Sequence, residues 1–184
     1  DKGAVARLVS MFEDRRPSAV HERVRVLDLL DSAEHPTRCA VLGITGTPGS
    51  GKSSLVAALT QRMLEGRSDL SIAVLAVDPS SHVSGGALLG DRTRMRFTRD
   101  ERRLYFRSQA SGTDLGGLGP SSFQVCRLLS RLFDCVIIET VGIGQSEADI
   151  RHLADRVYLV LQPLGGDEVQ FLKAGIIEVP DVFV

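Results

Sequence analysis

One segment constrains the fold of this chain more than any other: residues 46–53, which read GTPGSGKS. The segment matches the pattern G-x-x-x-x-G-K-S/T at every fixed position, and it lies between the apolar run CAVLGI and a helical pattern. Glycines in such a segment let the backbone turn so that successive N–H groups point inward at phosphate oxygens. The pattern therefore predicts a phosphate-binding loop between a buried strand and a helix. The alternative is a glycine-rich turn that matches the pattern by chance.

We expect both the loop and the start of the helix to contact a bound nucleotide and its metal ion. We expect Lys52 to reach the β and γ phosphates and the Ser53 hydroxyl to reach Mg²⁺, while the positive end of the helix faces the same anion. The residues expected to bind the nucleotide are Gly46, Pro48, Gly49, Ser50, Gly51, Lys52, Ser53 and Ser54.

The rest of the chain alternates short apolar runs with helical patterns. Runs that are apolar at successive positions are typical of parallel strands buried on both faces. They cover residues 39–44, 71–77, 104–108, 135–139, 157–162 and 182–184, with helical patterns at 53–65, 121–132, 146–154 and 168–177. This alternation predicts an α/β fold with a doubly wound, mostly parallel sheet, whose site lies beyond the carboxyl ends of the strands.

Two helical patterns precede the first strand. Their apolar positions are Val5, Leu8, Val9 and Phe12, then Val20, Val24 and Leu27 after Pro17. We expect residues 1–36 to form an N-terminal helical extension packed on the main sheet, and residues 37–184 to form the nucleotide-binding domain. The two apolar stripes are interpreted as core positions rather than as a docking face.

Composition excludes several classes of protein. A chain of 184 residues suits one domain, which buries roughly 70% of the surface of its unfolded form. A formal net charge of -1 argues against nucleic acid as a partner held by bulk electrostatics. The aliphatic run at 72–77 is far shorter than the roughly 18 residues of a membrane span. The start DKGAVARLVS has no secretory apolar core, so we expect a cytoplasmic protein.

The cysteines and histidines do not indicate a disulfide framework or a metal site. The three cysteines, Cys39, Cys126 and Cys135, are odd in number and lie in apolar surroundings, which favours reduced, buried thiols over disulfides or a zinc site. The four histidines lack the spacing of metal ligands.

An acid, Glu139, follows the apolar run at 135–138, and Gly142 comes soon after it. Nucleotide-hydrolysing domains of this kind deliver an acid toward magnesium, and a glycine N–H in the next loop senses the γ-phosphate. Since an unpaired buried carboxylate is costly, we expect Glu139 to face the Mg²⁺ water shell or the attacking water. The alternative is an exposed acid at the strand end that caps the next helix.

Two further acids are candidates for the metal site. Asp78 ends the run at 71–77 and precedes Pro79, which stops the strand, so Asp78 could hold a magnesium-bound water or could simply form a turn. Asp91 lies in the following glycine-containing loop and could meet the metal or the nucleophile in a closed form. The predicted catalytic residues are Lys52, Glu139 and Asp91, and the predicted metal site comprises Ser53, Asp78, Asp91 and Glu139.

Six segments, in this order and spacing, resemble one known family. They are GITGTPGSGKSSL, VDPSS, GGALLGDRTRM, SGTDLGG, ETVGIGQSE and PLGGDEVQFLKAGIIE. The chain resembles, over essentially its whole length, the MeaB/MMAA (ArgK-type) GTPases, chaperones of adenosylcobalamin-dependent acyl-CoA mutases. The first segment alone is unspecific, whereas the glutamate-glycine segment together with LGDR upstream is highly specific.

The resemblance implies a P-loop NTPase domain of the SIMIBI class that binds GTP or GDP with Mg²⁺. GTP hydrolysis would gate cofactor loading and protect or repair a mutase of the methylmalonyl-CoA mutase type. The resemblance assigns Asp78 and Asp91 to a first switch and Glu139 and Gly142 to a second. Gln170 and Lys173 would lie in a third switch that relays the nucleotide state to the mutase; from the sequence alone, Lys173 reads as a solvated helix residue.

The chain departs from the family in one respect. Family members read guanine with an Asn-Lys-x-Asp segment just after the strand written here as PDVFV, and the sequence stops at Val184. Guanine specificity therefore rests on the resemblance, and we expect a longer protein that carries this segment and the helices through which relatives form homodimers. The resemblance also makes adenosyltransferase a candidate second partner, and the mitochondrial matrix the expected compartment in a eukaryote.

The sequence alone leaves alternatives to a GTPase open. No residue has the character of a strong general base, so we expect slow intrinsic turnover that a partner accelerates. An ATP-dependent kinase and a nucleotide-binding scaffold without useful hydrolysis are the alternatives. The arginine-rich stretch at 92–107 is either a solvated face or a patch that touches the nucleotide, a partner or a CoA phosphate.

Overall fold

A computed structural model describes residues 1–32, 39–78, 101–110, 118–140, 149–162 and 180–184. The helices are α1 (Lys2–Glu13), α2 (Pro17–Ser32), α3 (Lys52–Gly66) and α5 (Pro120–Leu129). The strands are β1 (Ala40–Gly46), β2 (Ile72–Asp78), β3 (Leu104–Ala110), β4 (Cys135–Thr140), β5 (Arg156–Val160) and β6 (Val182–Phe183). All six pair in parallel in the order β3-β2-β4-β1-β5-β6, so the predicted doubly wound, parallel fold is confirmed.

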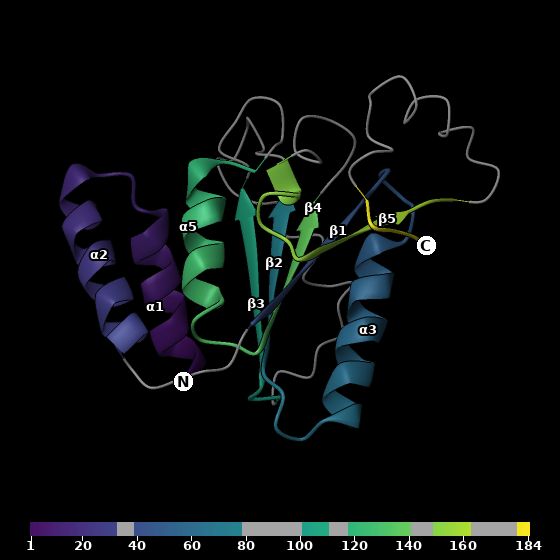
Figure 1. Cartoon of the computed structure of the whole chain (residues 1–184), viewed down its shortest axis with the longest axis horizontal. Coiled ribbons are helices and arrows are strands. Elements are labelled where there is room, and N and C mark those ends of the chain that lie inside the picture. The colour runs from purple at the N-terminus through teal and green to yellow at the C-terminus, as the bar shows by residue number, and fades with distance from the viewer. Residues whose placement is uncertain (33–38, 79–100, 111–117, 141–148, 163–179) are drawn as a thin grey trace.

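Helices cover both faces of this sheet (Figure 1). Helix α3 lies on one face, and α5 lies on the other with α1 and α2 outside it. Side chains alternate along each strand, so Val74 and Ile137 join the core under α3 while Leu75 and Ile138 join the opposite core. Strands β2 and β4 are therefore apolar at successive positions because both of their faces are buried.

A glycine in the central strand permits a close approach on the face opposite α3. A Cβ built at Gly43 would lie 2.8 Å from Cδ1 of Ile150 and 3.2 Å from Cβ of Ala154. Ile150 is fully buried at this point. A side chain at position 43 would push the segment at 149–154 off the sheet.

The N-terminal helices add an outer layer. Val9 and Phe12 of α1 are fully buried and join an apolar cluster with Val125 and Leu129 of α5. Helix α1 therefore packs mainly against α5, and at its carboxyl end the carboxylate of Glu13 pairs with Arg107 of β3. The extension thus meets the sheet at the edge strand β3 through this ion pair, while most of its packing is against α5 (Figure 1).

The stripe predicted for α2 was wrong at two of its three positions. Leu27 is buried, but Val20 is 45% exposed and Val24 is 52% exposed. The buried residues are Ala19 and Leu27, and Val26 and Leu30 pack partly against the same cluster. Helix α2 contacts the rest of the molecule on one narrow face, so Val20 and Val24 fall just outside it.

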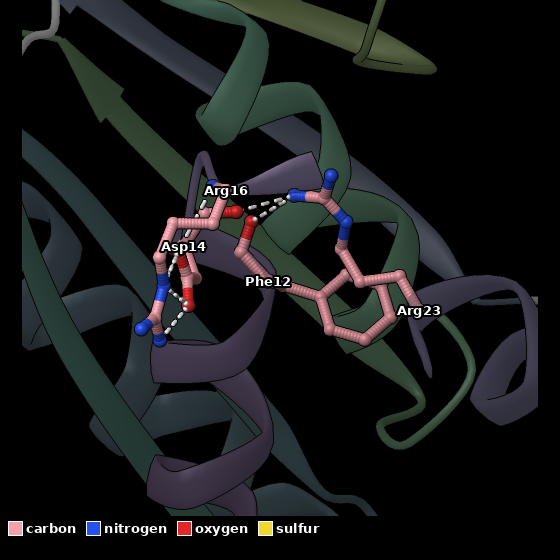
Figure 2. A network of polar contacts seen from close by, with 4 residues as sticks. All are labelled: Phe12, Asp14, Arg16 and Arg23. Atoms are coloured by element: carbon pink, nitrogen blue, oxygen red, sulfur yellow. Dashed lines mark hydrogen bonds and ion pairs between the residues drawn. The ribbon is translucent and has the colours of Figure 1, made fainter. Parts of the chain in front are cut away.

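Side chains fasten the turn between these two helices. Figure 2 shows the Arg23 guanidinium donating hydrogen bonds to the carbonyl oxygens of Phe12, at 3.2 Å, and Asp14, at 2.9 Å. These oxygens end α1, where carbonyls lack partners within the helix. In the same turn Arg16 donates to both carboxylate oxygens of Asp14, which lowers the pKa of that carboxyl to about 2. An arginine from α2 thus caps α1.

Several helices and strands end at other residues than the sequence predicts. Helix α5 ends at Leu129 rather than 132, because beyond Ser130 the N–H groups of Arg131 and Leu132 bond to carbonyls three residues back. Strand β5 spans 156–160 rather than 157–162, and β6 comprises only residues 182–183. The predicted helix at 146–154 is described only from 149 onward, where it ends within a turn, and the one at 168–177 lies outside the described residues.

The three cysteines are free thiols. Burial raises the pKa of Cys39 and of Cys126 to about 12 and that of Cys135 to about 11. Cys126 and Cys135 are buried as predicted, whereas Cys39 is half-buried. Within the described ranges, no helix has both the length and the apolar character that a bilayer crossing requires.

Candidate nucleotide-binding site

The glycine-rich loop begins at the carboxyl end of the central strand. Strand β1 pairs with β4 on one side and with β5 on the other. The chain leaves β1 through α3 toward β2, on the β4 side, while β5 lies on the other side. A ligand crevice in an open parallel sheet is expected at such a point, where the strand order reverses direction.

Three glycines of the loop have a positive φ, at positions 46, 49 and 51. Gly46 has a φ of 144°, and a Cβ there would lie 2.3 Å from the carbonyl oxygen of Val160 in β5. Gly49 has a φ of 84°, with nothing within 4 Å of an added Cβ. The first glycine is therefore needed for both space and conformation, and the second for conformation alone.

A tight turn forms the tip of the loop. The Ser50 N–H donates to the carbonyl oxygen of Thr47 over 3.1 Å. Pro48 occupies the second position of this turn and Gly49, with its positive φ, the third, which is the arrangement of a type II turn. The sequence TPGS thus explains the local fold directly.

Lys52 opens helix α3 and lies in the loop. Its side chain is buried, and its ammonium donates 2.7 Å hydrogen bonds to the carbonyl oxygens of Gly46 and Thr47. An ammonium has three N–H donors and no acceptor, so this group can serve only acceptors or anions inside the loop.

Ser53 and Glu139 join the helix to the sheet. The Ser53 hydroxyl donates to Oε1 of Glu139 over 2.6 Å. Glu139 is 6% exposed, so it is not the exposed helix-capping acid that the sequence left open. Glu139 lies inside β4, which continues one residue beyond the predicted run at 135–139, to Thr140, and its backbone is in register with Ile44 and Ala76 of the neighbouring strands. The strand continues because β1 and β2 extend beside it on both sides.

The opposite face of the same strand ends carries a second buried contact that the sequence did not reveal. The Thr140 hydroxyl donates to the Thr45 hydroxyl over 3.0 Å, and both residues are fully buried. Gln162, just beyond β5, was also missed; its amide donates to the carbonyl oxygen of Gly49 over 3.1 Å. The only sequence signal for these residues is their position at the carboxyl ends of apolar runs.

The other predicted site residues are placed in part or not at all. The backbone of Asp78 closes β2 in register with Ala110, one strand away from Glu139. Ser54 is exposed in the first turn of α3, and Pro48 is exposed at the loop tip. Four predicted residues lie outside the described ranges, and their roles stay predictions: Asp91, Gly142, Gln170 and Lys173.

The residues present fit a magnesium nucleotide. Ser53 and Glu139 offer hard oxygen ligands, and Lys52 with the α3 N-terminus suits phosphate. The hydroxyls of Thr47 and Ser50 are buried and have no hydrogen-bond partner within the described part of the chain. Among the described residues, no group of three or more His, Cys, Asp or Glu side chains could hold a metal ion.

Comparisons with known proteins bear on this site. The family model described as methylmalonyl-CoA mutase-associated GTPase MeaB matches residues 5–184. A relative from Pyrococcus horikoshii is 40% identical over 185 residues, covering 100% of this chain and 56% of its own. The GTPase ArgK of Escherichia coli is 35% identical over 185 residues, covering 100% and 55%. The mitochondrial methylmalonic aciduria type A homolog of Caenorhabditis briggsae is 35% identical over 192 residues, covering 100% and 46%.

A solved structure also supports the relationship to this family. The crystal structure of an LAO/AO transport system kinase superposes with a TM-score of 0.66 at 26% identity, covering 100% of this chain and 51% of that one. The chain thus spans about half the length of the curated relatives it matches. The family resemblance drawn from the six segments is confirmed by these matches: the chain belongs to the MeaB family, the methylmalonyl-CoA mutase-associated GTPases.

Proposed function

We propose that this protein is a Mg²⁺-dependent GTPase that serves as chaperone to an adenosylcobalamin-dependent acyl-CoA mutase. The observation that carries the hydrolytic part is the junction of loop, helix and strand: Lys52 is buried in the loop, and the neighbouring Ser53 is bonded to Glu139. These three side chains supply a cation and two hard oxygen ligands at the end of the glycine-rich loop.

Each side chain has a defined task in this proposal. Lys52 binds the phosphate oxygens on which charge develops and stabilises that charge. Ser53 and Glu139 would hold the metal, and Asp78 and Asp91 would complete its surroundings. Bound Mg²⁺ would supply neutralisation of the β and γ phosphate charges. Glu139, fixed by the Ser53 hydroxyl, would keep its orientation through the reaction.

The choice of GTP and of a mutase partner rests on family membership. The name GTPase ArgK supports GTP, and the family description together with the methylmalonic aciduria homolog supports a mutase of the methylmalonyl-CoA type. In this proposal GTP hydrolysis gates cofactor loading and protects or repairs the mutase. A homodimer of the full-length protein, an adenosyltransferase as second partner, and a cytoplasmic or mitochondrial matrix setting belong to the same proposal.

Hydrolysis measured with and without a partner tests this function. Phosphate release from GTP and from ATP is followed with the protein alone and with methylmalonyl-CoA mutase. We expect slow release from GTP, slower release from ATP, and acceleration by the mutase. A fast rate that the mutase does not change would contradict a chaperone GTPase.

The name of the structural neighbour, a transport system kinase, defines the competing function. A kinase transfers phosphate to an acceptor rather than to water. Labelled γ-phosphate recovered on a protein or small molecule, rather than as inorganic phosphate, would favour that function.

A further inference from the structure

The end of β5 lies against the loop at two places. The carbonyl oxygen of Val160 occupies the space where a side chain at Gly46 would lie, at 2.3 Å from the Cβ position. Two residues further, the Gln162 side chain reaches back and donates from Nε2 to the carbonyl oxygen of Gly49 over 3.1 Å. One strand end thus contacts both the start and the tip of the loop, although Gln162 and Gly49 are 113 residues apart in sequence.

The orientation of the Gly49 carbonyl determines the orientation of the Ser50 N–H. In a trans peptide the carbonyl and the following N–H point in opposite directions, so a donor that fixes the Gly49 oxygen also fixes the Ser50 N–H. That N–H closes the turn onto Thr47, whose oxygen also accepts from Lys52. Glycine at φ 84° has wide conformational freedom, and the Gln162 amide opposes that freedom from outside the loop.

We propose that Gln162 is a positioning residue of the nucleotide site: its amide holds the Gly49–Ser50 peptide so that the loop keeps its phosphate-binding conformation. The inference rests on the proposed nucleotide binding and adds a residue outside the glycine-rich motif to it. Gln162 touches the loop rather than the phosphates, so its contribution falls equally on bound substrate and transition state. Its loss therefore raises KM and leaves kcat unchanged.

The test compares side chains that differ in reach and in hydrogen bonding. Gln162→Met keeps the length and removes the donor, whereas Gln162→Asn keeps the amide and shortens the side chain by one methylene. Gln61→Met is the matched control, because Gln61 is an exposed glutamine of α3 whose amide bonds to Glu65. For each protein we measure the Kd of N-methylanthraniloyl-GDP with Mg²⁺, the kcat and KM for GTP, and the melting temperature.

We expect Gln162→Met and Gln162→Asn to raise the Kd and the KM about two- to tenfold, which is the contribution of one net hydrogen bond. Turnover and melting temperature stay at the wild-type values, since Gln162 is exposed, and Gln61→Met changes neither Kd nor KM. An equal loss of nucleotide affinity in both Gln162 variants shows that the amide must be carried on a side chain of the length of glutamine.

The outcomes are separable. If the wild-type protein does not bind the GDP probe, the proposed nucleotide binding itself fails. If the wild-type protein binds and both Gln162 variants match Gln61→Met, the positioning role is overturned. A fall in kcat at unchanged KM would overturn it as well, since it would place Gln162 in the chemical step.

Discussion

The phosphate loop and the N-terminal helix pair are held in opposite ways. The loop is attached to a strand with neighbours on both sides, and polar groups in and beside it are buried: Lys52 and Thr47 of the loop and Glu139 of β4 are each 6% exposed. The helix pair is attached through one apolar face of α1 and through guanidinium contacts near the surface, and Val20, Val24 and Leu29 of α2 are exposed. Position in the sheet, rather than residue type, therefore decides which polar groups can carry chemistry. Changes at the loop should alter function, and changes at the helix pair should alter stability.

Lys52→Ala makes the strongest test of that division. Removal of the buried ammonium should lower GTP turnover by about 100-fold or more, because no other part of the loop supplies a cation that stabilises developing phosphate charge. Phosphate release measures the effect, with Lys2→Ala in α1 as control. Turnover unchanged in Lys52→Ala would refute the assignment of the loop.

Glu139→Gln separates charge from position. The amide oxygen can still accept from Ser53, so the fold should be kept while the proposed metal site loses a charge. We expect turnover to fall about 10- to 100-fold and the Mg²⁺ concentration for half-maximal rate to rise. Glu65→Gln on the exposed side of α3 serves as control, and a wild-type magnesium titration in Glu139→Gln would argue against the metal role.

Thr140→Val probes whether a buried polar contact at the sheet centre also matters for stability. The substitution leaves the Thr45 hydroxyl buried beside a methyl group, which should lower the free energy of unfolding by about 1–2 kcal/mol. The double variant Thr45→Val/Thr140→Val should lose less than the sum of the two single variants. Urea unfolding measures all four proteins, and strict additivity would show that the two hydroxyls do not interact.

Asp14→Asn gives the smallest expected effect, at the surface of the helix pair. The Arg16 guanidinium lowers the pKa of Asp14 from its ordinary value of 3.8 to about 2, so the carboxylate stabilises the fold above about pH 4 and loses this contribution as the pH falls toward 2. The melting temperature of Asp14→Asn should lie slightly below wild type at pH 7, and the gap should close between pH 4 and 2. The control Asp28→Asn removes a carboxylate from the exposed side of α2. A gap that stays constant down to pH 2 would contradict the ion pair.

The sequence predicts the features formed by contiguous residues, but few of the contacts between residues that are distant in sequence. The loop is recognisable because its residues are contiguous, and the strands because burial on both faces leaves continuous apolar runs. The bonds from Gln162 to Gly49 and from Thr140 to Thr45 join residues 113 and 95 positions apart. They depend on the strand order, which periodicity does not specify. The predicted run at 135–139 stops one residue short of Thr140 for the same reason, since the length of β4 is set by its two neighbours.

The errors at Val20 and Val24 have a different origin. Helical periodicity identifies an apolar stripe but not the width of the face that a neighbouring helix covers. Helix α2 meets α1 along a narrow face centred on Ala19, Val26 and Leu27, so the two valines beside that face remain accessible. Side-chain caps such as Arg23 then decide how the helices meet (Figure 2).

The ladders on both sides of β1 have one more consequence. Residues 40–44 are in register with β4 and residues 42–46 with β5, so sliding this strand along its axis would break two sets of hydrogen bonds at once. The root of the phosphate loop is therefore a stationary origin against which displacements elsewhere in the molecule can be measured. Spectroscopic distance labels should have one member of each pair anchored beside β1, so that any nucleotide-dependent change in distance is assigned to the other label.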